Sequence, residues 1–317
     1  MAVSLLQASL KRDRLAPAYL FFGVPGVGKR LTAQRFCQAL LQMPSPSLNH
    51  PDLLWVEPTY LEKGKTYTRQ EAIAANLSLK GLAQIRLDQI RQLTEFLSHS
   101  PLKSSRLLVV IEGAETMAEP AANGLLKTLE EPGKATLILI APGLDNLLPT
   151  LVSRCQLIPF HRLSRQNLDQ VLSQVLTSEQ HQLPDQLPAA LWELVLTMAQ
   201  GSVGETLNGL TKYQEIEAIA PNLISNLISL ITNHQQIPSK NPKHQKLIQA
   251  LTLAKQISQT LELETQLWLL QLMHHSYWQT WHQPQIHQRL ERSLLQLRSH
   301  VQPRLVWEVL LWNLSCC

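Results

Sequence analysis

A glycine-rich segment that ends in a lysine is the part of this sequence best suited to chemistry. The segment Gly23–Lys29, with the sequence GVPGVGK, follows an apolar run and opens a stretch with helical spacing. Glycines let backbone N–H groups approach phosphate oxygens, and the N-terminus of the following helix favours anions. The spacing predicts a phosphate-binding loop in which Gly23, Gly26 and Gly28 shape the backbone and Lys29 reaches the outer phosphates.

The residues around this loop lack groups that hydrolysis needs. Active loops of this type carry Ser or Thr after the lysine, because that hydroxyl holds Mg²⁺. Here Arg30 follows, and a guanidinium cannot ligate a cation. An apolar strand should also end in two acids, one for the metal and one for the attacking water. In this chain the pair is Glu112-Gly113, which leaves Glu112 as a remnant, and we expect the nearby Glu115 to be a solvated acid at a helix start.

Short β-rich runs alternate with helical patterns over the first 160 residues, which is typical of a parallel sheet with helices on its faces. The predicted strands are Ala18–Phe22, Leu53–Val56, Arg106–Ile111, Thr136–Ile140 and Cys155–Pro159. The predicted helices are Gly28–Gln42, Leu87–Ser98 and Ala118–Leu129. Met43–His50 and Pro58–Asn76 are rich in proline and polar residues and are predicted as surface connections.

The second half of the chain is predicted to be helical. From Leu163 onward strand signals are absent, and prolines separate helical segments. A chain of 317 residues suits two or three domains, and we expect an α/β domain over 1–163, a small helical unit over 164–210 and a larger helical domain over 211–317. Five tryptophans of the last domain are predicted to pack in its core, with some at an interface: Trp268, Trp278, Trp281, Trp307 and Trp312.

The composition excludes several classes of protein. Hydrophobic residues make up 44% and charged residues 16% of the chain, which argues against disorder. The net charge of +4 is small, and the scattered lysines and arginines form no stripe for nucleic acid. The four cysteines include no CxxC pair, so neither a disulfide framework nor a metal site is indicated. We find no apolar run long enough for a membrane helix and no signal-peptide pattern, and therefore expect a cytoplasmic protein.

Two further motifs carry a family resemblance. Asn123–Pro132 (NGLLKTLEEP) and Ser153-Arg154-Cys155, together with the glycine-rich loop and His50-Pro51-Asp52, resemble segments of bacterial clamp-loader AAA+ subunits. The match covers roughly the first 160 residues, whereas Thr211–Cys317 matches only in helical character. The resemblance implies a RecA-like AAA+ domain, an all-α lid and an all-α collar that joins an oligomer.

In that family the Ser-Arg-Cys motif supplies an arginine finger, so the resemblance implies that Arg154 reaches the γ-phosphate bound by a neighbouring subunit. A planar, permanently charged guanidinium suits that role. Two sensor positions depart from the active pattern, because Ala141-Pro142-Gly143 lacks a polar side chain and Gly204 replaces an arginine. Many relatives carry a four-cysteine zinc module, and Gln38–Asp52 lacks one, so we expect no zinc.

The chain keeps Arg154 but has lost these catalytic and sensor residues. In this combination it resembles the delta-prime type of DNA polymerase III subunit rather than the motor type. The resemblance implies a non-catalytic stator in a hetero-oligomer with gamma/tau-type motor and delta-type subunits, which loads the sliding clamp onto primer-template DNA in replication. We expect no required cofactor, and whether the loop still binds ATP stays open. The alternatives are an active AAA+ ATPase, either a motor subunit or a branch-migration helicase, and a plain DNA-binding module.

Overall fold

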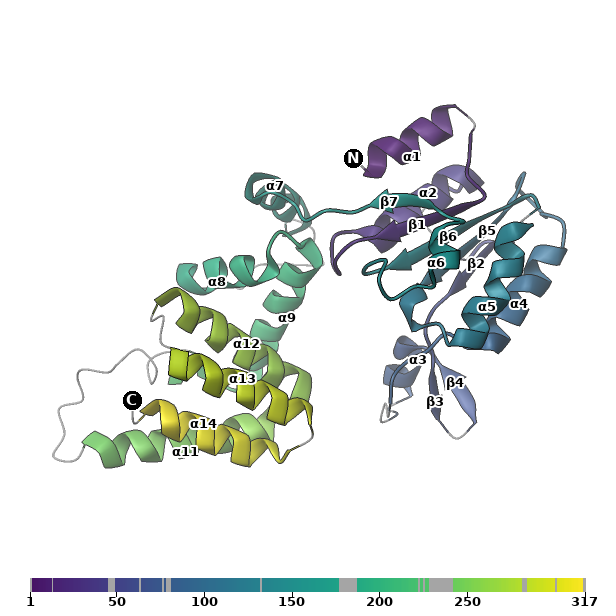
Figure 1. Cartoon of the computed structure of the whole chain (residues 1–317). Coiled ribbons are helices and arrows are strands. Elements are labelled where there is room, and N and C mark those ends of the chain that lie inside the picture. The colour runs from purple at the N-terminus through teal and green to yellow at the C-terminus, as the bar shows by residue number, and fades with distance from the viewer. Residues whose placement is uncertain are drawn as a thin grey trace. The chain divides into compact units, whose positions relative to one another are not determined.

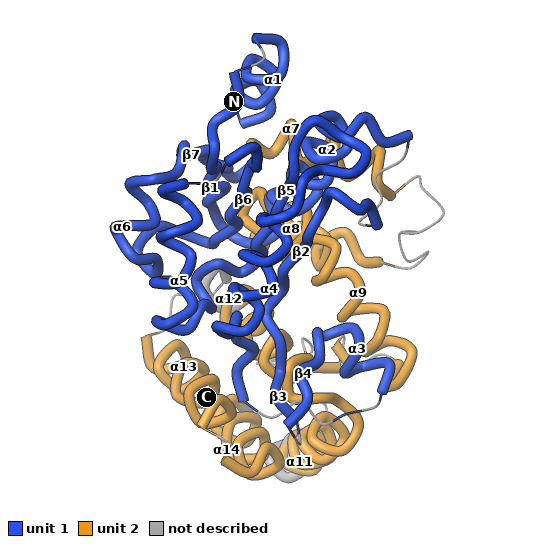
Figure 2. The backbone as a smooth tube through the Cα atoms, turned by 90° about the vertical axis from the view of Figure 1, so that its right-hand side faces the viewer, with its two compact units in different colours: residues 1–162 blue, residues 163–317 orange. Residues whose placement is uncertain are grey.

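The computed structural model describes residues 2–12, 14–44, 49–62, 64–75, 77, 81–131, 133–176, 187–221, 223–224, 226–227, 242–280, 284–299 and 301–315, without side chains at 242–246, 277–280 and 315. The chain divides into two compact units, residues 1–162 and 163–317 (Figure 2).

Unit 1 is built on a five-stranded parallel sheet with the order β2-β5-β6-β1-β7 (Figure 1). Its strands are β1 (Ala18–Phe22), β2 (Leu53–Val56), β5 (Leu107–Glu112), β6 (Ala135–Ala141) and β7 (Gln156–Pro159). All five predicted strands are present, with bounds within one residue of the prediction. The predicted parallel α/β fold of this region is therefore confirmed.

Helices cover both faces of the sheet, which explains why its strands are continuous apolar runs. On one face lie α1 (Ala2–Lys11) and α2 (Lys29–Leu41), which pack with Tyr19 and Phe21 of β1. On the other face lie α4 (Leu87–Ser98), α5 (Glu119–Glu130) and α6 (Pro149–Val152). Ala18 and Leu20 of β1 pack on that side, so alternate residues of one strand serve two separate cores.

The prediction of a plain connection over Pro58–Asn76 is wrong. This segment forms an antiparallel hairpin of β3 (Tyr60–Glu62) and β4 (Lys65–Tyr67), followed by α3 (Arg69–Ala74). Three-residue strands are too short to show an alternating pattern, which explains the failure. The helix start did carry a signal, because Thr68 and Glu71 form a capping box in which each side chain bonds the other residue's backbone N–H.

Unit 2 is all-helical over its described residues, as predicted. It begins with α7 (Arg165–Leu176), α8 (Ala189–Ala199) and α9 (Val203–Ile219). It continues with α11 (Pro242–Thr260), α12 (Leu263–Thr280), α13 (Pro284–Arg298) and α14 (Pro303–Ser315). The division into lid and collar stays a prediction, and its boundary at 210/211 falls inside α9.

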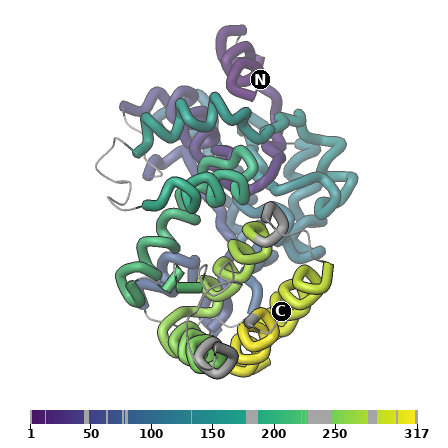
Figure 3. The backbone as a smooth tube through the Cα atoms, turned by 90° about the vertical axis from the view of Figure 1, so that its left-hand side faces the viewer, coloured from purple at the N-terminus to yellow at the C-terminus, as the bar shows by residue number. Residues whose placement is uncertain are grey.

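One large core joins most of unit 2. It draws buried side chains from α8, α9 and all four later helices, and α11 and α14 lie side by side (Figures 1 and 3). Trp307 is fully buried, and its Nε1 donates to Oε1 of Gln266 at 2.9 Å. Trp268 is also buried, as predicted, whereas Trp312 is 45% exposed. Trp281 and the side chain of Trp278 lie outside the described part of the chain.

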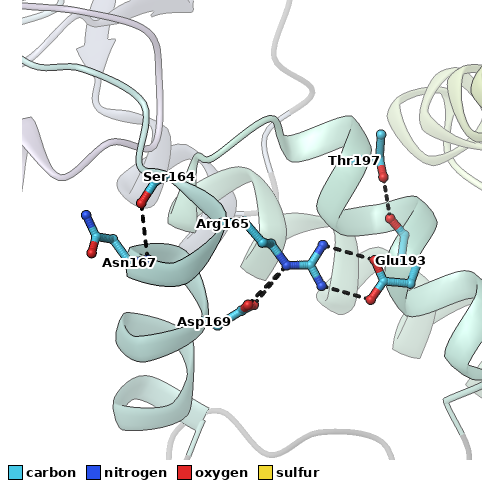
Figure 4. Close-up of polar contacts among 6 residues, drawn as sticks. All are labelled: Ser164, Arg165, Asn167, Asp169, Glu193 and Thr197. Carbon is cyan, nitrogen blue, oxygen red and sulfur yellow. Dashed lines mark hydrogen bonds and ion pairs between the residues drawn. The ribbon is translucent and has the colours of Figure 1, made fainter.

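A smaller apolar cluster holds α7 against α8 and α9, with Leu168, Leu172 and Leu196 at its centre. At its edge Arg165 of α7 donates two hydrogen bonds to Glu193 of α8, at 3.0 and 2.8 Å, and also pairs with Asp169 (Figure 4). These three side chains are about half exposed, so the ion pairs add little to stability and the apolar cluster carries the packing. Among the described residues, no helix combines the length and apolarity that crossing a lipid bilayer requires.

Candidate nucleotide-binding site and an exposed arginine

The phosphate-loop residues lie at the carboxyl edge of the sheet. Gly23–Lys29 connects the end of β1 to the start of α2. The strand register pairs Phe22 with Ala141 and Glu112 with Ile140, so the ends of β1, β6 and β5 lie next to one another. This edge is where ligands bind in open parallel sheets. The loop, Glu112 and Ala141 therefore lie at the edge where a nucleotide would be expected.

The loop backbone depends on glycine at its first position. Gly23 has a φ of +145°, and a Cβ atom there would lie 2.1 Å from the carbonyl oxygen of Phe160, which follows β7. Phe160 in turn donates its backbone N–H to the carbonyl oxygen of Phe22 at 2.8 Å. Any side chain at position 23 would therefore separate the loop from the neighbouring strand.

Lys29 is directed at its own loop. Its Nζ donates to the carbonyl oxygen of Val24 at 2.8 Å and also to that of Gly23, and the residue is only 9% exposed. Burial lowers the pKa of Lys29, and the charges of Glu115 and Glu112 oppose that shift. The ammonium thus bonds to the backbone that would otherwise surround a phosphate.

Arg30 brings together three side chains at the same edge. Its Nη1 forms an ion pair with Oε1 of Glu57 at 2.8 Å and a second ion pair with Glu112. The guanidinium lies 5.2 Å from the centre of the Trp55 ring, and Trp55 donates its Nε1 to Oε2 of Glu112 at 3.1 Å. The cation beside Glu112 is therefore a side chain of the protein itself.

This arrangement does not fit Mg²⁺-nucleotide. Magnesium binding needs oxygen ligands in near-octahedral geometry, whereas a guanidinium offers only donors. Arg30 already pairs with Glu112 and Glu57, and it stands at the position where a metal-holding hydroxyl would be required. Burial raises the pKa of Glu112, against the effects of Arg30 and Trp55, which further weakens it as a metal ligand.

The expectation that Glu115 is a solvated acid is wrong for part of its side chain. Glu115 does lie at a helix start, in η1 (Ala114–Thr116), but its Oε2 is buried and accepts no hydrogen bond from the residues that the structure describes. Burial raises its pKa, while its own backbone N–H and the charge of Lys29 oppose the shift. Its carboxylate therefore acts electrostatically on Lys29.

The backbone at position 113 disfavours the missing second carboxylate. Gly113 has a φ of +68°, and a Cβ atom there would lie 2.8 Å from Cγ of Pro58. An L side chain at such a φ is strained even where space is available. An acid at this position would therefore strain the backbone as it stands.

We expect Gly113→Ala to lower the free energy of unfolding by about 1–3 kcal/mol, because it adds backbone strain and a contact with Pro58. Gly143→Ala is the matched control, since Gly143 follows the neighbouring strand and a Cβ there meets no atom within 4 Å. Urea denaturation of both variants measures the difference. Equal midpoints for the two would show that the strain argument is wrong.

Arg154 lies at the opposite edge of the sheet. It follows α6 and comes two residues before Gln156, the first residue of β7, and β7 runs parallel to β1. The phosphate loop follows the last residue of β1, so about four residues of strand, or roughly 13 Å, separate the two edges. Arg154 therefore cannot serve the loop of its own chain.

The guanidinium of Arg154 is accessible. Its Nη2 pairs with Oε1 of Glu130 at 2.7 Å, and its Nη1 donates to the carbonyl oxygen of Thr150 at 3.1 Å. The side chain is 36% exposed, so a charged group from outside the chain can reach it. The flanking Cys155 is partly buried against the core beside α5 and α6, which anchors the turn that carries Arg154.

No sequence pattern marked three of the residues that form these sites. Trp55 lies in β2 and Glu57 directly follows it. The carboxyl end of β2 lies at the same edge of the sheet as Glu112, and this position of Glu57 is the sequence signal that could have indicated it. Glu130 lies in the motif Asn123–Pro132, but no sequence pattern links it to Arg154. Of the sensor positions, Ala141 is buried beside the loop, and Gly204 lies in the first turn of α9 in unit 2.

Metal binding has no candidate in the described part of the chain. The structure contains no group of three or more His, Cys, Asp or Glu side chains suited to a metal ion among those residues. Cys37 and Cys155 are free thiols there, and burial raises the pKa of Cys37 to about 12 and that of Cys155 to about 11. The expected absence of zinc stays a prediction.

Two family models match nearly all of the chain. The model described as DNA polymerase III, delta subunit, matches residues 1–164, and the model described as cyanobacterial DNA polymerase III delta prime, C-terminal domain, matches residues 166–314. A solved structure of a DNA polymerase III gamma subunit-related protein from Thermotoga maritima covers 99% of both chains with a TM-score of 0.59 and 18% identity. The AAA+ fold with a helical second half is thereby confirmed.

Curated relatives agree. The chain is 36% identical over 176 residues to DNA polymerase III subunit delta' of Bacillus subtilis, covering 51% of this chain and 47% of that protein. It is 35% identical over 160 residues to the subunit delta' of Pseudomonas aeruginosa, covering 45% and 43%. The matched region is thus less than half the length of these relatives. Because the two family models match successive parts of the chain, the chain belongs to the delta-prime family of DNA polymerase III subunits.

Proposed function

We propose that this protein is a non-catalytic subunit of the DNA polymerase III clamp loader, which supplies Arg154 to the nucleotide bound by a neighbouring motor ATPase. In this proposal the complex uses that contact to load the sliding clamp onto primed DNA. The partners are gamma/tau-type motor and delta-type subunits in a cytoplasmic hetero-oligomer, and the helices of residues 211–317 form its collar. Contact with primer-template DNA is made within the complex, through phosphates.

The location of Arg154 is the observation that carries the proposal. The guanidinium is exposed at the amino edge of the sheet, opposite the chain's own phosphate loop. An arginine that serves phosphoryl transfer must approach a γ-phosphate, and on this geometry that phosphate belongs to another chain. A planar cation that never loses its charge is suited to stabilising the transferred group.

Arg30 supports the non-catalytic part of the proposal. The ion pairs with Glu112 and Glu57 take up the charges that would otherwise attract Mg²⁺. Lys29 bonds to the loop carbonyls, and position 113 carries no second carboxylate. Electrostatic stabilisation is the main contribution to phosphoryl transfer, so these changes together remove most of the catalytic effect.

The proposal predicts that the purified chain shows no Mg²⁺-dependent ATP turnover above background. Arg30→Thr removes the guanidinium and restores a hydroxyl, so we expect it to gain Mg²⁺-dependent nucleotide binding but still no turnover, because position 113 remains glycine. Arg35→Thr, on the exposed side of the same helix, is the matched control. Calorimetric titration with Mg-ATP and a phosphate-release assay measure the two quantities.

Two results would contradict this proposal. Robust turnover by the unmodified chain, abolished by Lys29→Ala, would identify an active ATPase. Equal nucleotide binding by Arg30→Thr and Arg35→Thr would show that Arg30 is not what prevents metal-nucleotide binding.

A further inference from the structure

We propose that Glu130 competes with the neighbouring subunit's nucleotide for the guanidinium of Arg154. In the free protein the carboxylate of Glu130 holds the guanidinium, and in the assembled complex the γ-phosphate displaces that carboxylate. This inference rests on the proposed function, because it concerns how Arg154 becomes available to the neighbouring site.

The contact joins two elements that are distant in sequence. Glu130 is the last residue of α5, and Arg154 follows α6, which packs against α5. Oε1 of Glu130 lies 2.7 Å from Nη2 of Arg154, while Nη1 donates to the carbonyl oxygen of Thr150 at 3.1 Å. The Thr150 contact can persist when the carboxylate leaves. The guanidinium therefore has one fixed partner on its own turn and one exchangeable partner on α5.

The position of Glu130 does not favour helix stability. The C-terminal end of a helix carries a partial negative charge, so an acid in the last turn is disfavoured there. The carboxylate gains instead from the guanidinium beside it. Among the described residues, Glu130 supplies the carboxylate that pairs with Arg154, although the adjacent Glu131 carries the same charge and is exposed.

The strength of the pair suits an exchange. The side chains of Arg154 and Glu130 are 36% and 53% exposed, and ion pairs with such exposure are weak because water and salt screen them. A terminal phosphate bears more negative charge than a carboxylate and presents three acceptor oxygens, so it binds a guanidinium more strongly. Glu130 thus orients the guanidinium in the free subunit without preventing its transfer to the nucleotide.

The test is equilibrium binding of a slowly hydrolysed ATP analogue to the reconstituted complex of this chain with its motor subunits. Complexes carrying Glu130→Gln, Glu131→Gln, Arg154→Ala and the double variant Glu130→Gln/Arg154→Ala are compared. Glu130→Gln removes the competing charge and is expected to tighten binding about two- to fivefold. Glu131→Gln removes the same charge one residue away and should leave binding unchanged.

The double variant separates competition from a structural effect. If Glu130 acts through Arg154, Glu130→Gln should have no effect in a complex that already carries Arg154→Ala. Weaker binding with Glu130→Gln, or an equal effect of Glu131→Gln, would overturn the inference. An effect that persists without Arg154 would overturn it as well. Glu130→Ala provides a second variant if the amide disturbs the end of α5, and thermal unfolding of each variant checks the fold.

The same set of complexes distinguishes failure of this inference from failure of the proposed function. If Arg154→Ala changes neither binding nor hydrolysis of ATP by the complex, the trans role of Arg154 itself is wrong. If Arg154→Ala impairs the complex while Glu130→Gln leaves binding as it was, the arginine finger stands and only the competition by Glu130 is rejected.

Discussion

Arg154→Ala is expected to slow ATP hydrolysis at the adjoining motor site by about a thousandfold, the lower end of what an arginine finger contributes to phosphoryl transfer. The DNA-stimulated ATPase of the whole complex should fall by the share that this site contributes. Folding and assembly should be largely retained, because the side chain is partly exposed and its ion pair with Glu130 is weak. Single-turnover hydrolysis by the reconstituted complex measures the effect.

Arg154→Lys should not restore the rate. Lysine keeps the charge but lacks the planar fork that contacts two phosphate oxygens and Thr150 together. Arg106→Ala is the matched control, since Arg106 directly precedes β5 at the same edge of the sheet and bonds to Thr136 within the chain. A complex that hydrolyses ATP equally well with Arg154→Ala and with Arg106→Ala would require the trans role to be abandoned.

Asp52→Ala is expected to lower the free energy of unfolding by about 3 kcal/mol, because three backbone N–H groups would lose a charged acceptor. Asp52 is fully buried before β2 and accepts hydrogen bonds from the N–H groups of Leu102, Lys103 and Ser104 at 2.6–2.8 Å. The Ser104 hydroxyl donates a fourth bond at 2.9 Å. These contacts attach the segment before β5, the strand that carries Glu112, to the start of β2.

The same residue predicts a dependence on pH. Burial opposes ionisation of Asp52, but the hydrogen bonds from residues 102–104 outweigh it and lower its pKa from 3.8 to about 2. The unfolded chain therefore takes up this proton first as the pH falls, and the stabilisation is lost between about pH 4 and pH 2. Above the unfolded value the contribution is fully present.

Asp52→Asn should make the unfolding free energy less sensitive to pH across that interval, as measured by urea denaturation at several pH values. Asp88→Asn is the control, because Asp88 is an exposed acid on α4. If the pH dependence of the Asp52→Asn variant matches that of the unmodified chain, the bonds from residues 102–104 do not set the acid sensitivity.

The fold of unit 1 followed from the sequence because its central strands β1, β5 and β6 are buried on both faces. Runs such as Leu107–Ile111 are apolar throughout, and amphipathic stretches such as Leu87–Ser98 lie between them. The strands within residues 58–76 were not predicted, because β3 and β4 have three residues each and these residues are only partly buried or exposed. Short elements of this kind carry too few residues to show a period.

The sequence predicted which catalytic groups the site lacks, but not which side chains contact one another there. The motif positions of Lys29, Arg30 and Glu112 could be read directly, since local spacing defines them. The two partners of Arg30, Glu57 and Glu112, lie 27 and 82 residues away in the sequence. Glu130 lies 24 residues from Arg154. Only the folded sheet and α5 bring these pairs together. Likewise, nothing in the sequence shows that a Cβ atom at position 113 would meet Pro58.

The guanidinium of Arg30 has a consequence for how the protein behaves over time. A metal ion in such a pocket exchanges with the surrounding solution and departs with the spent nucleotide, whereas Arg30 is covalently tethered to α2 and stays beside Glu57 and Glu112. The cation beside these two carboxylates is therefore part of the chain and does not leave with a nucleotide.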